Sequence, residues 1–541
     1  MKDISSTGSF VDFTLENFIY VDKTEYIPKL LKLKRVFISR PRRFGKSLTL
    51  DTIATLFETG VEPYFKGTWI YDKWTEPTYP VLRLNFLDLD KYSLEHFKQK
   101  LNAIISSFAR DINVKNYEEK VEPEDTIYFL LDELRKEKRQ IVILIDEYDC
   151  QMTANINNET LYKQFQEKIK SFYANIKDKF AIKFLGITGV TRLKVVSIFS
   201  VGSDINDITN ASAYSQMIGF TRDEIKKFYI DYLKLAASYE NNCNVDEVTD
   251  TQIESLLDRL AQNYDGYCFD EFYKKKVFST WSVNKFFQSV VSNKFVYFGE
   301  YWYDNGGLPS ILVNYLKTHE LNIFEYLDKD KFLKVSSDDF KNPTALTTIN
   351  QNVLMCQTGY LTLRSDLNKT STVALGIPNG EIYKALNRLL ANNIFKGNTD
   401  ITDDYGRSLL EVGTVDDIIN LFNSALNSVS YDNYPIVTES SVQNMLKLYL
   451  LGAHQEVLSE VHEAKCRADL VVNTDNRRIV FEFKYAKNEA EAKSKLSEAV
   501  EQIKTRDYGN ILPKKNELIR IAAVFNADPK VRAFTENQIV P

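Results

Sequence analysis

The stretch Arg35–Ile53, RVFISRPRRFGKSLTLDTI, decides the fold because it joins a short strand to a helix through a phosphate-binding motif. Arg35–Ser39 is β-prone, and a helical pattern follows GKS, the tail of a phosphate-binding loop that includes Gly45. That loop pattern expects a glycine five residues before Gly45, and Arg40 stands there instead. The stretch alone therefore leaves two interpretations open, a phosphate cradle or a basic turn that contains GKS.

A second apolar run, Ile141–Ile145, predicts a buried parallel strand that ends in two carboxylates, Asp146 and Glu147. Ligands of α/β proteins bind at the carboxyl ends of such strands. In an ATP site Lys46 would hold the β and γ phosphate oxygens, while Ser47 and Asp146 would hold Mg²⁺. Glu147 would orient or deprotonate the attacking water. Acidic residues after a strand also form turns or helix caps, but the two motifs together favour an ATPase.

Two further groups of side chains are candidates for contact with phosphate. The run Phe184–Arg192 ends in polar groups, so Thr188 is a candidate sensor of the γ-phosphate and Arg192 is either a second sensor or a salt-bridge former. Arg42 and Arg43 lie in a basic run without Asp or Glu, and we expect one of them to contact phosphate or a facing subunit.

The C-terminal part of the chain carries a different constellation. Residues two apart in a strand share a face, so Arg467 lies beside Asp469 and Glu482 lies beside Lys484. A hairpin turn within 473–477 would bring Asp469 and Glu482 opposite each other, close enough to share one Mg²⁺. Lys484 would position a water or stabilise charge on a scissile phosphate. The alternative is an ion-pair cluster on a wet sheet face, and the apolar alternation of the strand favours the site.

The helices and strands expected in this part follow from its periodicity. They are a helix over 440–451, strands over 456–462, 466–472 and 478–484, a helix over 489–504 and a strand over 518–525.

Ordered sequence blocks along nearly the whole chain resemble a prokaryotic AAA-ATPase-like family with a C-terminal PD-(D/E)xK nuclease domain. The blocks are Tyr20–Thr24 (YVDKT), Arg40–Ser47 (RPRRFGKS), Ile145–Asp149 (IDEYD), Gly189–Arg192 (GVTR), Gly219–Thr221 (GFT), Tyr264–Tyr267 (YDGY), Trp281–Val283 (WSV) and Gln357–Tyr360 (QTGY). The resemblance implies that RPRRFGK serves as the Walker A motif without its first glycine. It also implies that Lys46 and Ser47 bind nucleotide and Mg²⁺, and that Asp146 and Glu147 form the Walker B pair.

For the C-terminal domain, the resemblance implies two nuclease motifs, Arg467–Val471 and Phe481–Lys484. Gln502 and Tyr508 resemble the trailing Gln and Tyr of many members of this superfamily. Glu439 or Glu456 would supply an upstream acid, and we favour Glu439 because it opens the first helix of the domain.

Composition sets limits on partners and location. The net charge is −6, and from Ser430 onward 16 Lys and Arg balance 16 Asp and Glu, so tight autonomous DNA binding is not expected. Delivery of substrate by the ATPase region, a partner protein or a homo-oligomer is the expectation that follows. Five scattered cysteines argue against a zinc site or disulfide framework. No signal core or apolar span is present, so we expect a cytoplasmic protein that does not enter membranes.

We predict an α/β architecture in three parts. Residues 1–210 form a P-loop NTPase, AAA-ATPase-like sheet domain, 211–427 a mainly helical lid or middle region, and 428–541 a restriction-endonuclease-like α/β domain. The expected function is ATP binding and hydrolysis coupled to a nuclease that uses Mg²⁺, with Mn²⁺ as an alternative. DNA is favoured over RNA as its substrate, and the sequence does not separate the two. A role in defence or mobile-element conflict is the hypothesis for its setting. The competing hypothesis is an ATP-driven signalling or scaffold protein whose nuclease-like domain only binds nucleic acid or a partner.

Overall fold

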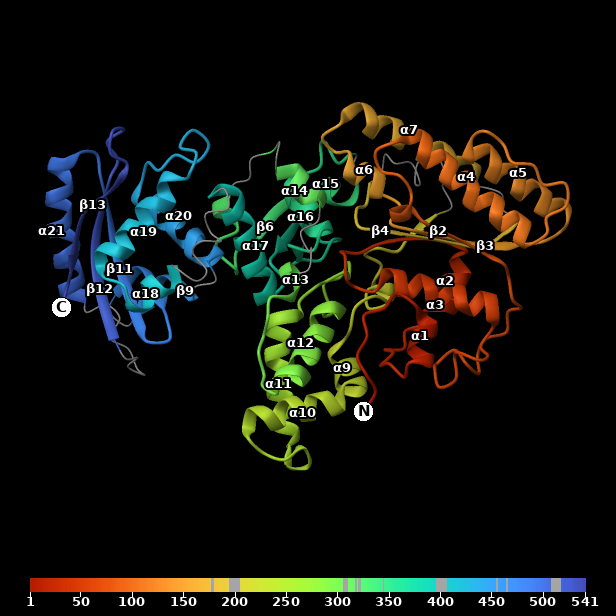
Figure 1. Ribbon diagram of the computed structural model, residues 1–541, viewed down its shortest axis with the longest axis horizontal. Helices are drawn as coiled ribbons and strands as arrows, with labels where there is room; N and C mark the ends of the chain where they lie inside the picture. The colour runs from red at the N-terminus through yellow and green to blue at the C-terminus, as the bar shows by residue number, and fades with distance from the viewer. Residues whose placement is uncertain are drawn as a thin grey trace. The chain divides into compact units, whose positions relative to one another are not determined.

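The computed structural model describes residues 1–176, 180–193, 205–304, 310–316, 319, 323–343, 345–395, 406–453, 456–463, 466–506 and 517–541. The chain forms two compact units, and Figure 1 follows it through both. The first unit comprises Met1–His319 and Phe332–Ile382, and the second comprises Glu320–Lys331 and Tyr383–Pro541. In the described part of the chain, no helix is both long enough and apolar enough to cross a membrane.

The N-terminal part of the first unit is a parallel sheet between two layers of helices (Figure 1). Its elements are α1 (Phe10–Leu15), α2 (Ile27–Leu33), β1 (Arg35–Ser39), α3 (Lys46–Thr59), β2 (Val81–Asn85), α4 (Leu94–Asp111), α5 (Pro123–Lys136), β3 (Ile141–Asp146), α6 (Cys150–Ala154), α7 (Glu159–Asn175), β4 (Ile182–Gly189) and β5 (Asn206–Asp207). Helices α4, α5 and α7 cover one face, and α1, α2 and α3 lie on the other.

The strand order of this sheet is β2-β3-β4-β1-β5, and its neighbouring strands pair in parallel. Strand β4 therefore separates β1, which leads into the GKS loop, from β3, which ends at Asp146. The carboxyl ends of all three strands meet at one edge, which is where parallel sheets bind ligands. The two strands predicted around the GKS loop and the Asp146–Glu147 pair, β1 and β3, are confirmed to within one residue at each end.

The rest of the first unit is mainly helical. Its elements are α9 (Arg222–Phe228), α10 (Ile230–Asn241), α11 (Asp250–Tyr264), α12 (Thr280–Asn293), α13 (Tyr301–Asp304), α14 (Ser310–Leu316), β6 (Leu333–Ser336), α15 (Ser337–Lys341), α16 (Gln351–Gln357), β7 (Thr362–Leu363), β8 (Thr372–Gly376) and the start of α17 (Gly380–Ile394). The strands form a small antiparallel sheet, β6-β8-β7, which sequence periodicity did not indicate because two of them span four residues or fewer.

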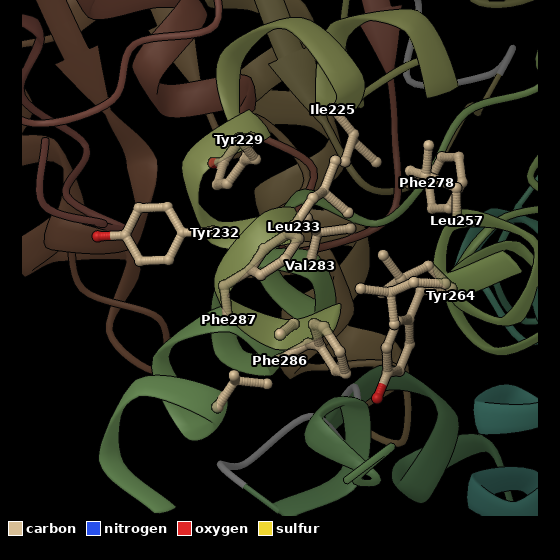
Figure 2. Packing of buried hydrophobic residues seen from close by; sticks show 14 of the residues in the cluster. Ile225, Tyr229, Tyr232, Leu233, Leu257, Tyr264, Phe278, Val283, Phe286 and Phe287 are labelled. Carbon is tan, nitrogen blue, oxygen red and sulfur yellow. The ribbon is translucent and has the colours of Figure 1, made fainter. Parts of the chain in front are cut away.

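Helices α9 to α12 share an aromatic core, shown in Figure 2. Tyr229 from the end of α9 stacks on Phe287 of α12 with ring centroids 5.3 Å apart, and Phe286 packs edge-on against Phe287. Ile19 and Val21 from the N-terminal segment belong to the same core. This helical region therefore folds against the beginning of the chain.

The second unit is built on a five-stranded mixed sheet of order β13-β12-β11-β10-β9. Its elements are the rest of α17, α18 (Arg407–Val412), α19 (Val415–Asn427), α20 (Glu439–Gly452), β9 (Glu456–Glu463), β10 (Cys466–Asn473), β11 (Arg477–Ala486), α21 (Glu489–Arg506), β12 (Glu517–Asn526) and β13 (Ala533–Ile539). All elements expected from sequence are present. Strand β13 was not predicted, because only three residues of its sequence, AFTENQI, are apolar and they do not alternate.

Helices cover both faces of this sheet. Residues of α21, including Ala499 and Ile503, pack with Val480 of β11 on one face. On the other, Phe422 of α19 packs against Phe481 at 5.3 Å. Helix α19 precedes residue 428, the predicted start of the last domain, yet it is part of the second compact unit.

Candidate functional site

The GKS loop forms a turn at the amino end of α3. Gly45 adopts φ +102°, and a Cβ at this position would have no atom of the described residues within 4 Å. The backbone conformation, rather than crowding, therefore favours glycine there. Lys46 is 4% exposed, and its ammonium donates to the carbonyls of Arg40 and Pro41 at 3.2 Å each. Its Nζ also lies 3.5 Å from Oε1 of Glu147, so the lysine bridges the loop and the end of β3.

Arg40, which replaces the first glycine, points its side chain into the protein. It is 1% exposed, and its Nη1 donates to the carbonyls of Thr209 at 2.6 Å and Ser39 at 2.9 Å. The guanidinium lies 4.1 Å from the ring centroid of Phe269. Burial lowers the pKa of Arg40 to about 9. The residue that replaces the missing glycine therefore anchors the loop to the protein interior through its buried side chain.

The carboxylate of Asp146 lies between two hydroxyl groups. Ser47 Oγ donates to its Oδ2 at 2.6 Å, and the Thr188 hydroxyl donates to its Oδ1. Since β4 lies between β1 and β3, the end of β4 carries Thr188 to this position. The structure thus brings the predicted Ser47, Asp146, Glu147 and Thr188 together around Lys46.

Asp149, which the sequence analysis did not single out, fixes the chain after β4. Its buried carboxylate accepts from the N–H of Thr191 at 2.6 Å and from the Thr191 hydroxyl at 2.5 Å. Burial raises the pKa of Asp149, and the charge of Glu147 raises it further. A Cβ on Gly189 would lie 2.8 Å from Asp149 Oδ1, so glycine is required for this close approach. Asp149 and Gly189 lie in the IDEYD and GVTR blocks that carry the family resemblance, and this position was the available signal.

Blocks that are distant in sequence meet at the loop. Gln357 accepts from the Arg192 N–H at 3.2 Å and donates to its carbonyl at 3.4 Å. The ideal Cβ of Gly359 would approach Pro41 to 2.9 Å. The QTGY and GVTR blocks therefore pack around the loop rather than belonging to a separate lid.

The remaining candidate arginines differ in their surroundings. Arg192 forms an ion pair with Asp207 through Nε, one of the two outcomes that the sequence left open. Arg43 donates from Nη1 to the carbonyls of Tyr301 and Trp302, 3.1 Å each. Arg42 is half-buried, and within the described residues no hydrogen bond or ion pair involves its side chain.

A cavity opens beside the loop in the first unit. It is lined by Gly45 and Thr49 of the loop and α3, by Tyr20 and Thr24 of the N-terminal segment, and by Trp281 of α12. The wall is mostly apolar, which suits the face of a heterocyclic base next to a phosphate site. The YVDKT and WSV blocks thus both contribute to this cavity.

The three core residues of the predicted nuclease site lie together in the second unit. Glu482 is 0% and Lys484 6% exposed. Lys484 Nζ donates to Glu482 Oε1 at 2.8 Å, and Asp469 Oδ2 accepts from the Phe483 N–H at 2.8 Å. The pairing of Leu470 with Phe481 fixes β10 against β11 immediately beyond them. The site is therefore buried between layers, not a wet ion-pair surface.

Glu482 and Asp469 of this site are buried in surroundings that disfavour their ionised forms. Burial raises the pKa of Glu482 to about 7, with a further increase from the Asp469 charge and a partial offset from Lys484. Burial also raises the pKa of Asp469. Glu482 Oε2 is buried, and no hydrogen-bond partner for it is found among the described residues. A bound cation would supply the missing interaction for this oxygen.

The accessory nuclease candidates occupy different places. Glu439 opens α20, and its Oε1 lies 3.4 Å from Lys484 Nζ, so it belongs to the cluster. Gln502 is half-buried in α21. Arg467 pairs with His462 on the backbone of β10, and its side chain lies outside the described part. Tyr508 lies outside the described residues.

In the described part of the chain, no group of three or more His, Cys, Asp or Glu side chains is close enough to hold a metal ion. Mg²⁺ in proteins is often held by only one or two carboxylates, with waters and substrate phosphates completing its shell. Asp469 and Glu482 therefore fit a site of this kind, in which most ligands come from water and substrate.

Two family models match the chain. Residues 5–199 match the family described as "Predicted AAA-ATPase", and residues 437–535 match the PD-(D/E)XK nuclease superfamily. The chain thus joins an AAA-ATPase-like domain to a PD-(D/E)XK nuclease superfamily domain, and the architecture expected from the sequence blocks is confirmed.

One curated relative extends over almost the whole chain. It is the "Uncharacterized protein in vnfD 5'region" of Azotobacter chroococcum mcd 1, 26% identical over 533 residues, which cover 95% of this chain and 94% of the relative. Two solved structures are similar at 12% identity. The Walker-type ATPase PABY2304 of Pyrococcus abyssi has a TM-score of 0.33 and covers 67% of this chain and 94% of its own, and Cdc6p from Pyrobaculum aerophilum has a TM-score of 0.23 and covers 68% and 93%. These scores are too low to carry an argument.

Proposed function

We propose that the protein binds and hydrolyses ATP in its first unit and cleaves phosphodiester bonds, in DNA rather than RNA, in its second. The observation that carries the nuclease part is the buried carboxylate of Glu482, which lies beside Asp469 and Lys484 and has one oxygen without a hydrogen-bond partner in the described part of the chain. Burying a carboxylate oxygen without a hydrogen-bond partner lowers the stability of the fold, so its presence indicates a site for a ligand of opposite charge.

For the ATP site, the proposal rests on the cluster at the carboxyl edge of the parallel sheet. Lys46 would bind phosphate oxygens, and Ser47 and Asp146 would hold Mg²⁺, which neutralises charge on the phosphates when bound. Glu147 would accept the proton of the attacking water or orient it. The apolar cavity beside Gly45 would receive the base.

For the nuclease site, Asp469 and Glu482 would hold Mg²⁺ or Mn²⁺, which lowers the pKa of bound water and clamps the phosphate. Lys484 would orient the water or stabilise charge on the phosphate oxygens. Glu439, with its oxygen 3.4 Å from Lys484 Nζ, would be the upstream acid that orients this lysine. Because the domain is electrically neutral, we propose that the ATPase unit, a partner or a second copy delivers the substrate.

The decisive experiment is a cleavage assay with the full chain on single- and double-stranded DNA and RNA. Each substrate is incubated with and without ATP, and with Mg²⁺, Mn²⁺ or EDTA. We expect metal-dependent cleavage of DNA that ATP changes at least severalfold. ATP hydrolysis with no cleavage of any substrate would instead favour the signalling or scaffold hypothesis. The hypothesis of a role in defence or mobile-element conflict stays a prediction.

A further inference from the structure

Arg43, in the middle of the phosphate-binding loop, is held at both its side chain and its backbone by the helical region. Its guanidinium donates to the carbonyls of Tyr301 and Trp302 and lies 4.7 Å from the ring centroid of Trp281. Its own carbonyl accepts from the Thr280 hydroxyl at 2.8 Å and from the Trp281 N–H at 3.4 Å. The first turn of α12 thus contacts both the side chain and the backbone of Arg43 and holds this part of the loop in place.

The groups that hold Arg43 are themselves fixed. Trp281 Nε1 donates to the Tyr301 carbonyl at 3.1 Å, which ties α12 to α13. The buried Glu381 carboxylate accepts from the Trp302 N–H at 2.8 Å and from the Ser282 hydroxyl at 2.7 Å. The carbonyls that Arg43 contacts are therefore held in place by α12 and by the first turn of α17.

The backbone of the loop shows why such anchoring is needed. Arg43 adopts φ +67°, a conformation that is uncommon for residues other than glycine, and two residues later Gly45 adopts φ +102°. Between them Phe44 is 1% exposed and packs edge-on against Tyr267 at 4.7 Å. Because a non-glycine residue persists in this conformation only when its surroundings hold it, the contacts of Arg43 stabilise the shape of the loop.

We propose that Arg43 is a positioning residue, which holds the glycine-poor loop in its phosphate-binding shape through Trp281 and the carbonyls of Tyr301 and Trp302. This inference rests on the proposed ATP site. It differs from the sequence-based expectation that Arg42 or Arg43 contacts phosphate or a facing subunit. A residue that shapes the cradle affects every nucleotide that enters it, whereas a γ-phosphate contact affects ATP alone.

The test uses the full chain with Arg43→Ala, Trp281→Phe and the double variant, and measures dissociation constants for ATP and ADP by calorimetry. We expect Arg43→Ala to weaken both nucleotides by the same factor, about tenfold. Trp281→Phe should weaken both about threefold, and the double variant should be no weaker than Arg43→Ala alone, because the two residues act as one unit. Lys285→Ala is the control, since Lys285 Nζ also lies over Trp281, at 4.8 Å, on the same helix; it should bind both nucleotides as the parent does.

A second measurement keeps the inference separate from the proposed function. Hydrogen exchange of the loop amides, followed without nucleotide, should be faster in Arg43→Ala than in Lys285→Ala and the parent. Unchanged loop exchange in Arg43→Ala would overturn the positioning role, as would a loss confined to ATP or additive losses in the double variant. If the parent binds no nucleotide but its loop exchange still depends on Arg43, the ATP site is wrong and the loop anchor stands.

Discussion

The two candidate sites both place two carboxylates near a lysine, but they satisfy those carboxylates differently. In the first unit Asp146 receives hydrogen bonds from Ser47 and Thr188, and Glu147 is 18% exposed at its side chain. In the second unit Glu482 is fully buried, and within the described ranges only one of its oxygens has a hydrogen-bond partner. The carboxylates of the candidate ATP site therefore have partners within the protein, whereas the candidate nuclease site carries a carboxylate whose charge is not fully compensated. The difference indicates that the second site depends more on a cation for its charged form.

The largest expected effect concerns Glu482, the incompletely hydrogen-bonded carboxylate of the second unit. Glu482→Gln keeps the shape of the side chain but removes a metal-binding charge, so cleavage should fall on the order of 10³-fold. Thermal unfolding should show a midpoint equal to or above that of the parent, because an uncompensated buried charge is removed. Glu501→Gln, at an exposed position of α21, is the matched control and should cleave normally. Undiminished cleavage by Glu482→Gln would remove the basis of the nuclease site.

The next effect concerns the candidate ATP site of the first unit, whose carboxylates have partners within the protein. Lys46→Ala should weaken ATP binding about 100-fold, since it removes charge-assisted hydrogen bonds to phosphate. Glu147→Gln should bind ATP normally but hydrolyse it about 100-fold more slowly. Equilibrium binding and phosphate release measure the two effects. Lys32→Ala serves as control, because Lys32 is exposed in the same basic run. Normal hydrolysis in both Lys46→Ala and Glu147→Gln would contradict the ATP site.

A smaller effect concerns the residue that fixes the end of β4. Asp149→Ala leaves the buried N–H and hydroxyl of Thr191 without their acceptor, so the free energy of unfolding should fall by about 2–3 kcal/mol. Asp88→Ala, at an exposed position after β2, should change it by less than about 0.5 kcal/mol. Urea unfolding compares the two. Equal stability of both variants would show that the Asp149 contacts do not matter for the fold.

The smallest effect, measured per pH unit, is a pH dependence to which Glu482 of the second site should contribute. The folded-state pKa of Glu482, about 7, lies above its ordinary value, so the protonated form is favoured by folding. The contribution of Glu482 to stability is therefore fully present below pH about 4.3 and is lost as the pH rises through 7. Over this window the equilibrium constant for folding should fall by up to about tenfold per pH unit. Asp469, whose pKa is also raised, acts in the same direction.

Unfolding of the metal-free protein between pH 4.5 and 8, followed by fluorescence, checks this dependence. Glu482→Gln should lose stability less steeply than the parent over this range. A parent and variant with parallel curves would mean that burial does not raise the pKa of Glu482. Added Mg²⁺ should restore stability above pH 7 in the parent but not in the variant.

The sequence alone was sufficient to predict those structural features that have strong local signals. Ile141–Asp146 is an apolar run of strand length, and it is strand β3 with the carboxylates at its end. The order of polar and apolar residues around Asp469 and Glu482 likewise placed both side chains in one cluster. These features depend on residues close in sequence, which is why periodicity identifies them.

Other features depend on partners that lie far along the chain. Arg40 contacts the Thr209 carbonyl, 169 residues away, and Arg43 contacts the Trp302 carbonyl, 259 residues away. No local pattern indicates either contact, so the sequence-based expectation was only that Arg42 or Arg43 contacts phosphate or a facing subunit, and Arg40 was identified only as the replacement of the first glycine. The burial of Glu482 was similarly hidden, because it requires that α21 and α19 cover both faces of the sheet.

The path of the chain through its two compact units limits how the protein can be divided. The chain leaves the first unit after His319, returns at Phe332 and leaves it again within α17, after Ile382. Within the second unit, the Tyr383 hydroxyl donates to the Leu327 carbonyl at 2.9 Å, so the short inserted segment is part of its fold. A single cut at residue 428 would remove α19 and its Phe422 from the sheet that they cover. Fragments for biochemistry must therefore keep both crossings, and the nuclease superfamily region is best studied inside the intact polypeptide.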